Sequence, residues 1–255
     1  MLVISKYVLL DLLKNRSILV YTIILGILSF SLLNLDSQSS KGLLSLLNIT
    51  LLFVPVITTL FATIYFFNSL EFIELLLCQP IKRSSILLSE YSGMALSLSV
   101  SYAAGIGIPL LLMVSGTASL MLVATGVLLT FIFTAIALFI FVLFRDKTKG
   151  IGAAIVVSLF FTLLFDGLVM AFIFSFSEYP IDQALVGIMA FNPVDLGRVL
   201  MLLQLDVAVL MGYSGALFKK FLGSATGSIY SVACMLCWIF IPLLLSVRIF
   251  EKKDL

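Results

Sequence analysis

The chain has 255 residues, of which 62% are hydrophobic and only 11% are charged, and it contains no histidine. So much apolar sequence excludes an ordinary soluble domain, and the net charge of +2 is too small to suggest a nucleic-acid partner. The lack of histidine removes the commonest general base and metal ligand. We therefore predict an all-α polytopic membrane protein that is not an enzyme and holds no cofactor of its own.

The first segment, residues 1–16, is interrupted by charges at Lys6, Asp11, Lys14 and Arg16, so it is not a span. Its pattern is typical of an amphipathic helix that lies at the membrane interface, with basic residues on its polar side. The alternative is an ordinary lead-in to the first span. The two interpretations are compatible.

Six apolar runs follow, and each is long enough for a membrane-crossing helix of about 20 residues or slightly fewer. We expect Pro55 to kink the second span, while Gly105, Gly107 and Pro109 loosen the third and allow close helix approach. The third and fourth spans separate at 115–119. The predicted spans are 18–33, 43–67, 94–114, 119–144, 151–176 and 229–247.

The loop at 68–93 carries charge between two charge-free runs. Ser69 is placed to cap a short helix, and Pro80 ends that helix because its ring clashes with the preceding turn. A second helix then begins at Ser84 or Ser85. The charged residues of this helix–turn–helix are Glu71, Glu74, Lys82, Arg83 and Glu90.

This loop resembles the segment after the second span of ABC-2-type transporter permeases. The matching residues are Glu71, Glu74, Leu75, Leu76, Leu77, Gln79, Pro80, Ile81, Arg83, Ser84, Ile86, Leu87, Leu88, Tyr91 and Gly93. The resemblance implies a cytoplasmic coupling helix that docks in a groove of a separate ABC ATPase. It assigns the ATPase contact to Glu71, Glu74, Gln79, Pro80 and Arg83. The alternative is a polar loop that has no partner.

The same resemblance implies the assembly. Six spans make half of a translocation unit, so the family pattern implies a homodimer with two copies of the ATPase, which binds ATP and Mg. The sequence contains no phosphate-binding Walker A string, so we expect ATP hydrolysis on that separate chain.

Asp166 lies near the middle of the predicted fifth span. A carboxylate there costs about 2.5 to 3.5 kcal/mol, so it must face the bundle interior, a partner subunit or water, or be protonated. It is either a transport-path residue or a packed side chain with no transport role. An ion-coupled secondary transporter with Asp166 as its ion site is the alternative function, although no paired inverted halves are visible.

The polar stretch 177–228 is expected to form a small helical subdomain on the outer face. Asn192, Pro193 and Asp195 have the order of a helix start, and the helix should run through Arg198 towards Gln204. A further helix is predicted at 207–221. The competing interpretation makes 199–218 a seventh span.

The string Asn192-Pro193-x-Asp195-x-x-Arg198-x-Leu200 resembles NosY-type permeases, which serve maturation of the copper–sulfur centre of nitrous oxide reductase. It also resembles parts of gliding-motility and sodium-export permeases. The first resemblance implies a periplasmic β-helical partner in contact with Asn192, Pro193, Asp195 and Arg198.

Eleven of the 15 Lys and Arg residues fall on one face when six spans are threaded with both termini inside. This bias follows the positive-inside rule. It predicts the inner membrane of a bacterium, with both termini and the loop at 68–93 in the cytoplasm.

Cys234 and Cys237 are three residues apart, which places both sulfurs on one helix face. Soft ligands suit Cu(I), and Met235 lies beside the pair, while Met189, Met201 and Met211 belong to the predicted outer subdomain. Cysteine and methionine also pack well as apolar side chains, and we expect packing here. Cys78 is expected to be inert.

Overall fold

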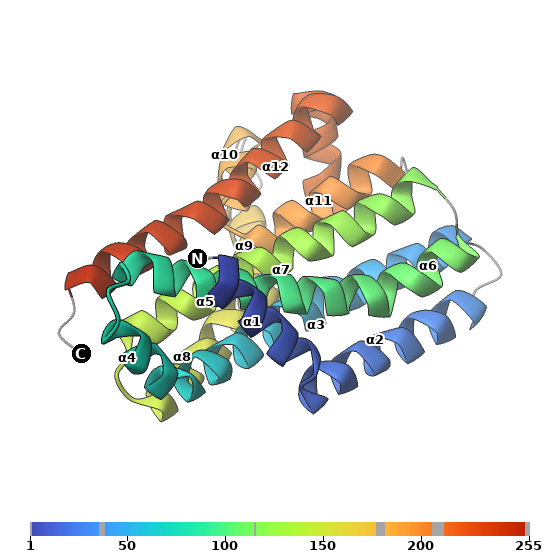
Figure 1. The fold of residues 1–255 in the computed structure, drawn as a ribbon. Coiled ribbons are helices and arrows are strands. Elements are labelled where there is room, and N and C mark those ends of the chain that lie inside the picture. Colours follow the sequence, from blue (N-terminus) through green and yellow to red (C-terminus); the bar gives the residue numbers. More distant parts are fainter. Residues whose placement is uncertain (1, 36–38, 115, 177–181, 206–211, 253–255) are drawn as a thin grey trace.

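The structure is helical throughout the part of the chain that it describes, with short turns between helices (Figure 1). This computed structural model describes residues 2–35, 39–114, 116–176, 182–205 and 212–252. The helices are α1 (Leu2–Leu13), α2 (Arg16–Leu35), α3 (Ser39–Asn68), α4 (Leu70–Leu77), α5 (Arg83–Tyr102), η1 (Ala103–Gly107), α6 (Ile108–Met113), α7 (Thr117–Leu143), α8 (Lys147–Leu159), η2 (Phe160–Leu164), α9 (Phe165–Ser175), α10 (Asp182–Met189), α11 (Pro193–Leu205) and α12 (Gly212–Lys252), of which η1 and η2 are π-helices.

Six helical stretches are long and apolar enough to cross a membrane, which confirms the predicted fold class. They overlap the six predicted spans but extend beyond most of the apolar runs, because polar residues continue the helices at their ends. They are Arg16–Asn34, Lys41–Asn68, Arg83–Met113, Thr117–Leu143, Lys147–Ser175 and Thr226–Lys252.

The loop before the third span is shorter than predicted. The helix–turn–helix order is confirmed, but the second helix begins at Arg83 and continues through α5, η1 and α6 to Met113. Glu90, which the sequence places in a polar loop, is instead fully buried in this span. The loop proper therefore consists of α4 and the turn at residues 78–82.

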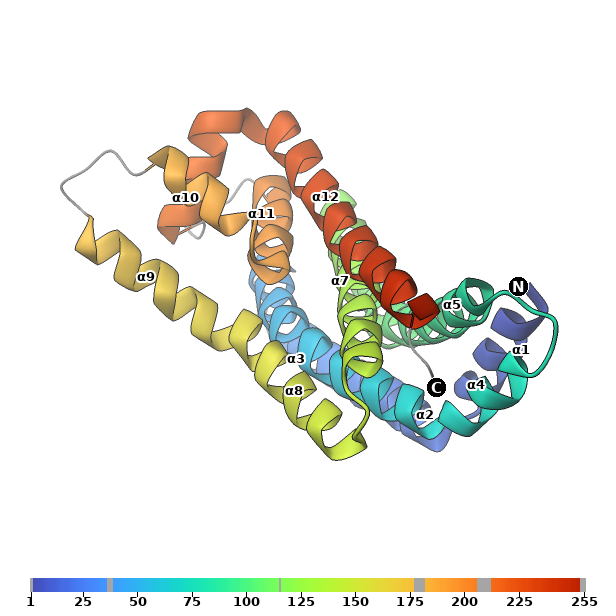
Figure 2. The same cartoon turned by 90° about the vertical axis from the view of Figure 1, so that its left-hand side faces the viewer.

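Helix α7 forms the centre of the bundle, since 72% of its membrane window is buried inside the protein. It packs against α3, α5, α11 and α12, and Figure 2 shows it surrounded by them. A Cβ at Gly126 would lie 2.1 Å from Cζ of Tyr102, so the crossing of α5 and α7 requires glycine there. Tyr102 also lies 3.2 Å from Thr50, Oη to Oγ1, which connects this crossing to α3.

The glycines predicted to loosen the third span lie in a π-helix, η1. A Cβ at Gly105 would come within 2.8 Å of Cβ of Leu25, so this segment allows α2 to approach closely. Small residues at helix crossings serve the same purpose in other membrane proteins. At Pro55, where a kink was predicted, α3 continues as one helix.

Helices α10 and α11 form part of the helical segment that was predicted between the fifth and sixth spans. Helix α11 packs against α12, α7 and α3, and it lies alongside α7 in Figure 1. Its apolar residues belong to the main core, so this segment is part of the bundle. Its buried residues include Val194, Leu196, Val199, Leu200, Met201, Leu202 and Leu203.

The helix predicted at 207–221 falls partly within α12. From Gly212 this segment is the first part of α12, which continues without a break to Lys252, while residues 206–211 lie outside the described ranges. Residues 199–218 do not form a span among the described helices, since α11 ends at Leu205.

The N-terminal helix α1 has one buried side and one exposed side, and the exposed side carries apolar residues such as Tyr7 as well as charges. Val8 and Leu12 are buried, and Lys6, Tyr7 and Asp11 are exposed. Its buried side packs against α5. The helix ends at Leu13, before α2 begins at Arg16.

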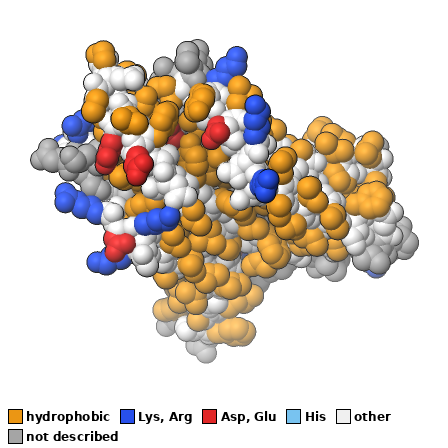
Figure 3. Space-filling view, turned by 60° about the horizontal axis from the view of Figure 1, so that its bottom comes forward, with side chains coloured by type: hydrophobic (Ala, Val, Ile, Leu, Met, Phe, Trp, Pro, Cys, Tyr) orange, Lys and Arg blue, Asp and Glu red, His pale blue; other side chains and the backbone are white. Residues whose placement is uncertain are grey.

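Charged side chains gather at the end of the bundle that carries α4, whereas hydrophobic side chains cover most of the remaining surface in view (Figure 3). We call this the basic end, and define it by Lys82, Arg83, Arg145, Lys147, Lys149, Arg248 and Lys252, all of them exposed. An apolar surface with charges at its end is what a bilayer requires of a helical bundle.

Candidate coupling helix and polar cluster

Helix α4 has one buried face and one exposed face. Ile73 and Leu76 are buried at 2% and 8% exposure, whereas Glu71 and Glu74 are exposed and Leu75 is 68% exposed. The buried pair fixes the helix to the bundle. The exposed face presents two carboxylates and one large apolar side chain, a combination suited to docking against another protein.

The start of α4 differs from the prediction in one detail. Ser69 precedes the helix, but its side chain does not cap it. The Ser69 hydroxyl donates instead to the carbonyl oxygen of Tyr65 at 2.9 Å, four residues back in α3. Such a bond to the preceding turn is a common alternative for serine, and here it fixes the junction of α3 and α4.

The end of α4 agrees with the prediction, because the helix stops at Leu77 before Pro80. A tight turn follows, in which the amide of Ile81 donates to the carbonyl oxygen of Gln79 at 2.7 Å. Helix α5 then starts at Arg83. All five residues predicted to contact an ATPase lie exposed on this one projecting loop: Glu71, Glu74, Gln79, Pro80 and Arg83.

A buried polar contact connects the two spans on either side of α4. The Tyr65 hydroxyl of α3 donates to Oε2 of Glu90 in α5 at 3.0 Å, and the other carboxyl oxygen of Glu90 has no partner among the described residues. Sequence reasoning missed this pair. The available signal was the helical spacing of Glu90 with Leu87 and Met94, which places it on the apolar face of the third span.

Further contacts attach α4 to its neighbours. Tyr7 of α1 stacks on Phe72 of α4, with ring centroids 6.3 Å apart. A Cβ at Gly93 would lie only 2.5 Å from a methyl carbon of Val8, so α1 crosses α5 at this glycine. The Tyr91 hydroxyl donates to the carbonyl oxygen of Phe131 in α7 at 3.1 Å. Tyr91 and Gly93, two of the residues that carry the family resemblance, thus have structural roles inside the chain.

Asp166 is paired within the chain. It lies 19 residues after Lys147 and nine before Ser175, in the second half of the fifth span and not at its middle. Its Oδ2 accepts from Nη2 of Arg198 at 2.9 Å. Both side chains are a little more than one-third exposed, at 38% and 37%. The structure thus places Asp166 in an intramolecular ion pair between α9 and α11, which was not among the environments predicted for it.

Arg198 also reaches Asp195, whose Oδ1 accepts from Nη1 at 3.1 Å. Asp195 is only 3% exposed, and its other oxygen accepts from the amide nitrogen of Asn192 at 3.1 Å. One guanidinium therefore bridges a half-exposed and a buried carboxylate, an arrangement that the fork of arginine favours. We call Asp166, Asn192, Asp195 and Arg198 the polar cluster.

Asn192 begins α11 as predicted, because its Oδ1 accepts from the amide of Val194 at 3.0 Å. Its Nδ2 also donates to the carbonyl oxygen of Phe161, in η2, at 3.1 Å. A π-helix disturbs the regular backbone ladder, so this side chain supports the irregular part of the fifth span. The indole of Trp238 in α12 donates to the carbonyl oxygen of Ala190 at 3.0 Å, and fixes the turn between α10 and α11.

Burial limits what the predicted partner-contact residues can reach. Asn192, Pro193 and Asp195 are buried in this chain, and Arg198 alone among the four is half-exposed. Contact with a periplasmic partner stays a prediction. Arg198 and the neighbouring Phe191, which is 70% exposed, are the accessible residues for it.

Cys234 and Cys237 lie together on α12, whereas Cys78 is in the turn after α4. Cys78 and Cys237 are exposed, Cys234 is half-buried, and all three are free thiols. Met189 and Met201 lie in the apolar core, while Met211 lies outside the described residues. Within the described ranges, no cluster of three or more His, Cys, Asp or Glu residues could hold a metal ion.

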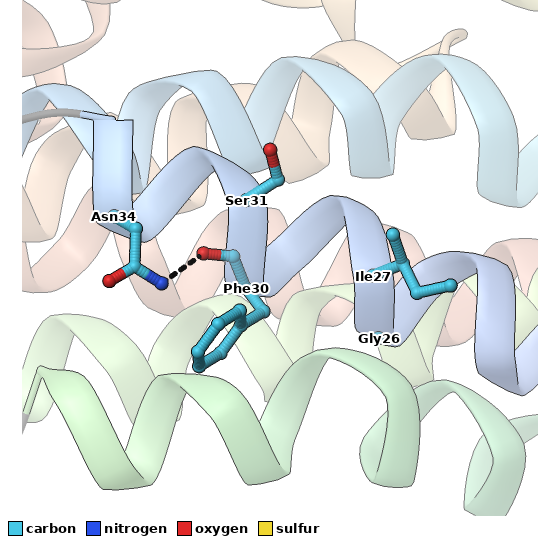
Figure 4. Close-up of a pocket in the computed structure, with 5 residues that line it drawn as sticks. All are labelled: Gly26, Ile27, Phe30, Ser31 and Asn34. Carbon is cyan, nitrogen blue, oxygen red and sulfur yellow. Dashed lines mark hydrogen bonds between the residues drawn. The ribbon is translucent and has the colours of Figure 1, made fainter.

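Helix α2 carries a shallow groove on its outer surface, with a volume of about 580 Å³. Figure 4 shows its lining residues, Gly26, Ile27, Phe30, Ser31 and Asn34, all on this one helix. The Asn34 side chain donates to the carbonyl oxygen of Phe30 at 2.8 Å. The Asn34 amide is thus engaged with its own helix.

The sequence matches the family model described as "ABC-2 family transporter protein" over residues 25–255. The chain belongs to the ABC-2 transporter family. The match includes all six spans except the first part of α2, and it includes α4 and the polar cluster. No individual curated protein matches the sequence significantly. The ABC-2 assignment confirms the resemblance at family level, and makes the protein a transmembrane subunit of an ABC transporter.

Proposed function

We propose that this ABC-2 protein is the permease subunit of an ATP-driven transporter, and that α4 with the turn at residues 78–82 is the place where a separate ATPase chain binds. The observation that carries the proposal is the exposed face of α4. Glu71, Glu74 and Leu75 project from a helix whose other face is fixed by Ile73 and Leu76. A rigid, anchored helix can pass on a partner's movement, whereas a loose loop cannot.

The full transporter is a homodimer with two ATPase copies, which hold ATP and Mg. The basic end, with α4 and both termini, faces the cytoplasm of a bacterial cell whose inner membrane holds the protein. The gathering of Lys and Arg at one end supports this orientation. Six spans in one chain support a dimer, because they supply half of the usual translocation unit.

The test is a charge reversal on the exposed face, Glu71→Lys with Glu74→Lys. The matched control is Glu251→Lys, since Glu251 is an exposed carboxylate at the same end of the bundle. We expect the double variant to lose its co-purifying ATPase and its ATP hydrolysis in membranes, while the control retains both. An ATPase retained by the double variant would show that α4 is not the docking site.

The narrower proposal is maturation of the copper–sulfur centre of nitrous oxide reductase. It is supported by the string from Asn192 to Leu200, and it requires a periplasmic β-helical protein that contacts the region of Arg198 and Phe191. Mass spectrometry of proteins that co-purify with the tagged chain from native membranes tests it. An ATPase with a β-helical repeat protein supports maturation, whereas an ATPase alone indicates an exporter of another substrate, of the gliding-motility or sodium and drug type.

No observation favours the ion-coupled secondary transporter. Asp166, its proposed ion site, is engaged by Arg198 at 2.9 Å, and the family is that of ABC transporters.

A further inference from the structure

An apolar groove lies between α8 and α12, with α7 as its base. Its volume is about 560 Å³, and every lining side chain is apolar. Figure 2, viewed from the basic end, shows α7 between the other two helices. The groove runs from Leu143 and Phe144 at the end of α7, past Ala153 of α8 and Leu245 of α12, to Trp238.

The groove opens towards the surroundings of the bundle. Only 22% of the α8–α9 span window and 28% of the α12 window are buried inside the protein. Its walls include Val156 at 65% exposure and Ile241 at 57%. The volume lies within the range of about 300–1,000 Å³ typical of small-molecule sites. In a bilayer, the apolar molecule available to such a groove is a lipid acyl chain.

Each of the three lining helices reaches a basic residue at the same end of the groove. Arg145 directly follows Phe144, Lys149 lies one turn before Ala153, and Arg248 lies three residues after Leu245. Residues three or four apart share a helix face, so Lys149 and Arg248 continue the walls of the groove. All three are exposed, and none forms an ion pair or hydrogen bond with a described residue.

The two described acidic residues near this end are outnumbered by four basic ones, Arg145, Lys149, Arg248 and Lys252. Asp146 accepts from the amide of Thr148 at 2.8 Å, as the cap of α8. Glu251 lies six residues after Leu245, so it is on a different face of α12 from the groove. Lys252, seven residues after Leu245, adds a further positive charge on the groove side.

We propose that this groove binds an anionic phospholipid, with an acyl chain against α7, α8 and α12 and the phosphate headgroup held by Arg145, Lys149 and Arg248. Basic residues placed where spans leave the membrane attract anionic headgroups, and arginine binds phosphate through two parallel hydrogen bonds. A second copy of the chain is a poorer occupant. In a two-fold dimer both basic ends lie on the same side of the membrane, so like charges would meet there.

A bound acyl chain would also contact Phe161 and Trp238, which are bonded to Asn192 of the polar cluster and to the turn before it. Phe161 and Trp238 line the groove, with ring centroids 5.3 Å apart. The Phe161 carbonyl accepts from Asn192, and the Trp238 indole donates to Ala190. A lipid in the groove therefore packs against the same two residues that hold the turn between α10 and α11.

The test uses the only tryptophan of the chain, Trp238. The full-length protein is placed in phosphatidylcholine nanodiscs that contain an increasing fraction of either brominated phosphatidylglycerol or brominated phosphatidylcholine. Bromine quenches tryptophan fluorescence on contact. We expect the anionic lipid to reach half-maximal quenching at about ten- to 100-fold lower fraction than the zwitterionic one, because three basic residues attract its headgroup.

The variant Arg145→Gln, Lys149→Gln, Arg248→Gln should lose this preference. The control Lys6→Gln, Lys14→Gln, Arg16→Gln removes the same charge from exposed sites on α1, on α2 and in the turn between them, and should keep the preference. Equal quenching by both lipids in the unmodified protein would overturn the proposal. So would absence of quenching by either lipid together with disulfide dimers of a Val156→Cys variant whose native cysteines are replaced by serine. That outcome would show that a second copy of the chain occupies the groove.

A groove-filling variant gives an independent measurement. Ala153→Phe should lower the phosphatidylglycerol retained by the full chain in native mass spectrometry, relative to Val20→Phe on the exposed surface of α2. A monodisperse size-exclusion peak shows that both variants fold. If Ala153→Phe folds and still retains the lipid as the unmodified protein does, the lipid lies elsewhere.

Discussion

Replacing Gly93 by alanine tests how the coupling helix is attached to the rest of the bundle. A Cβ at this position would lie 2.5 Å from Cγ1 and 2.7 Å from Cβ of Val8, and 3.2 Å from the carbonyl oxygen of Ser5. Two of these three atoms, Cβ of Val8 and the carbonyl oxygen of Ser5, are held in place by the backbone of α1. The third belongs to a valine side chain, which has one strongly preferred rotamer in a helix. The clash therefore cannot be relieved by a side-chain rotation, and α1 itself must move.

Two opposing contributions set the expected magnitude. Alanine stabilises a helix interior by about 0.5–1 kcal/mol relative to glycine, whereas overpacking costs about 1–3 kcal/mol. The net loss is about 0.5–2 kcal/mol, and at about 2–4 °C per kcal/mol for a chain of this size the melting temperature falls by several degrees. The displaced α1 should also separate Tyr7 from Phe72 of α4, so coupling to an ATPase should weaken as well.

Thermal unfolding in detergent, followed by loss of the monodisperse size-exclusion peak, measures the first effect. Gly152→Ala is the matched control, because a Cβ there meets nothing within 4 Å, and it should raise the melting temperature slightly. The second effect is measured as the ATP hydrolysis that the permease supports in membranes. A Gly93→Ala variant as stable as Gly152→Ala would refute the reasoning, since it would show that α1 does not press on α5.

Two further substitutions test the buried polar contacts. Arg198→Met should lower stability by about 2–3 kcal/mol, mainly because the buried Asp195 loses a charge-assisted hydrogen bond. The half-exposed pair with Asp166 adds little to this loss. Arg198→Lys should lose less stability, and equal melting temperatures of the two variants would contradict this. Tyr65→Phe should lower stability by about 1–3 kcal/mol, because it leaves Glu90 buried without a donor. Glu90→Gln should be neutral or stabilising because it removes a buried acid, and destabilisation by Glu90→Gln beyond that of Tyr65→Phe would show that the carboxylate itself is required.

The sequence predicts those parts of the fold that follow from local chemistry. Long apolar runs give the six spans, Pro80 ends α4, and Asn192 caps α11. Each of these depends on residues that are close together in the chain. The face of α4 that is exposed also follows from its own pattern, because Ile73 and Leu76 share one side of the helix.

What the sequence could not give depends on residues that are distant in the chain. Asp166 has its partner 32 positions away, in a helix that lies within the polar stretch 177–228. Helix α11 enters the bundle because its apolar side fits against α3, α7 and α12, which is a property of their surfaces and not of its own composition. The sequence places Glu90 in a loop because charged residues of membrane proteins usually lie outside the spans. Its burial is tolerable because Tyr65, 25 residues earlier, donates a hydrogen bond to it.

The fifth span, made of α8, η2 and α9, joins the coupling loop to the polar cluster. At the start of this span, the Lys147 side chain donates to Oδ1 of Asn68 at 2.6 Å. Asn68 is the last residue of α3, just before α4 begins. Further along, the carbonyl of Phe161 in η2 accepts from Asn192, and Asp166 in α9 pairs with Arg198. The fifth span is thus bonded to the coupling loop at one end and to the polar cluster beyond its middle. A displacement of α4 that moves Asn68 must either move this span as a whole or be absorbed at η2, where the backbone ladder is already irregular. The polar cluster therefore responds to ATPase movement in the first case and is insulated from it in the second.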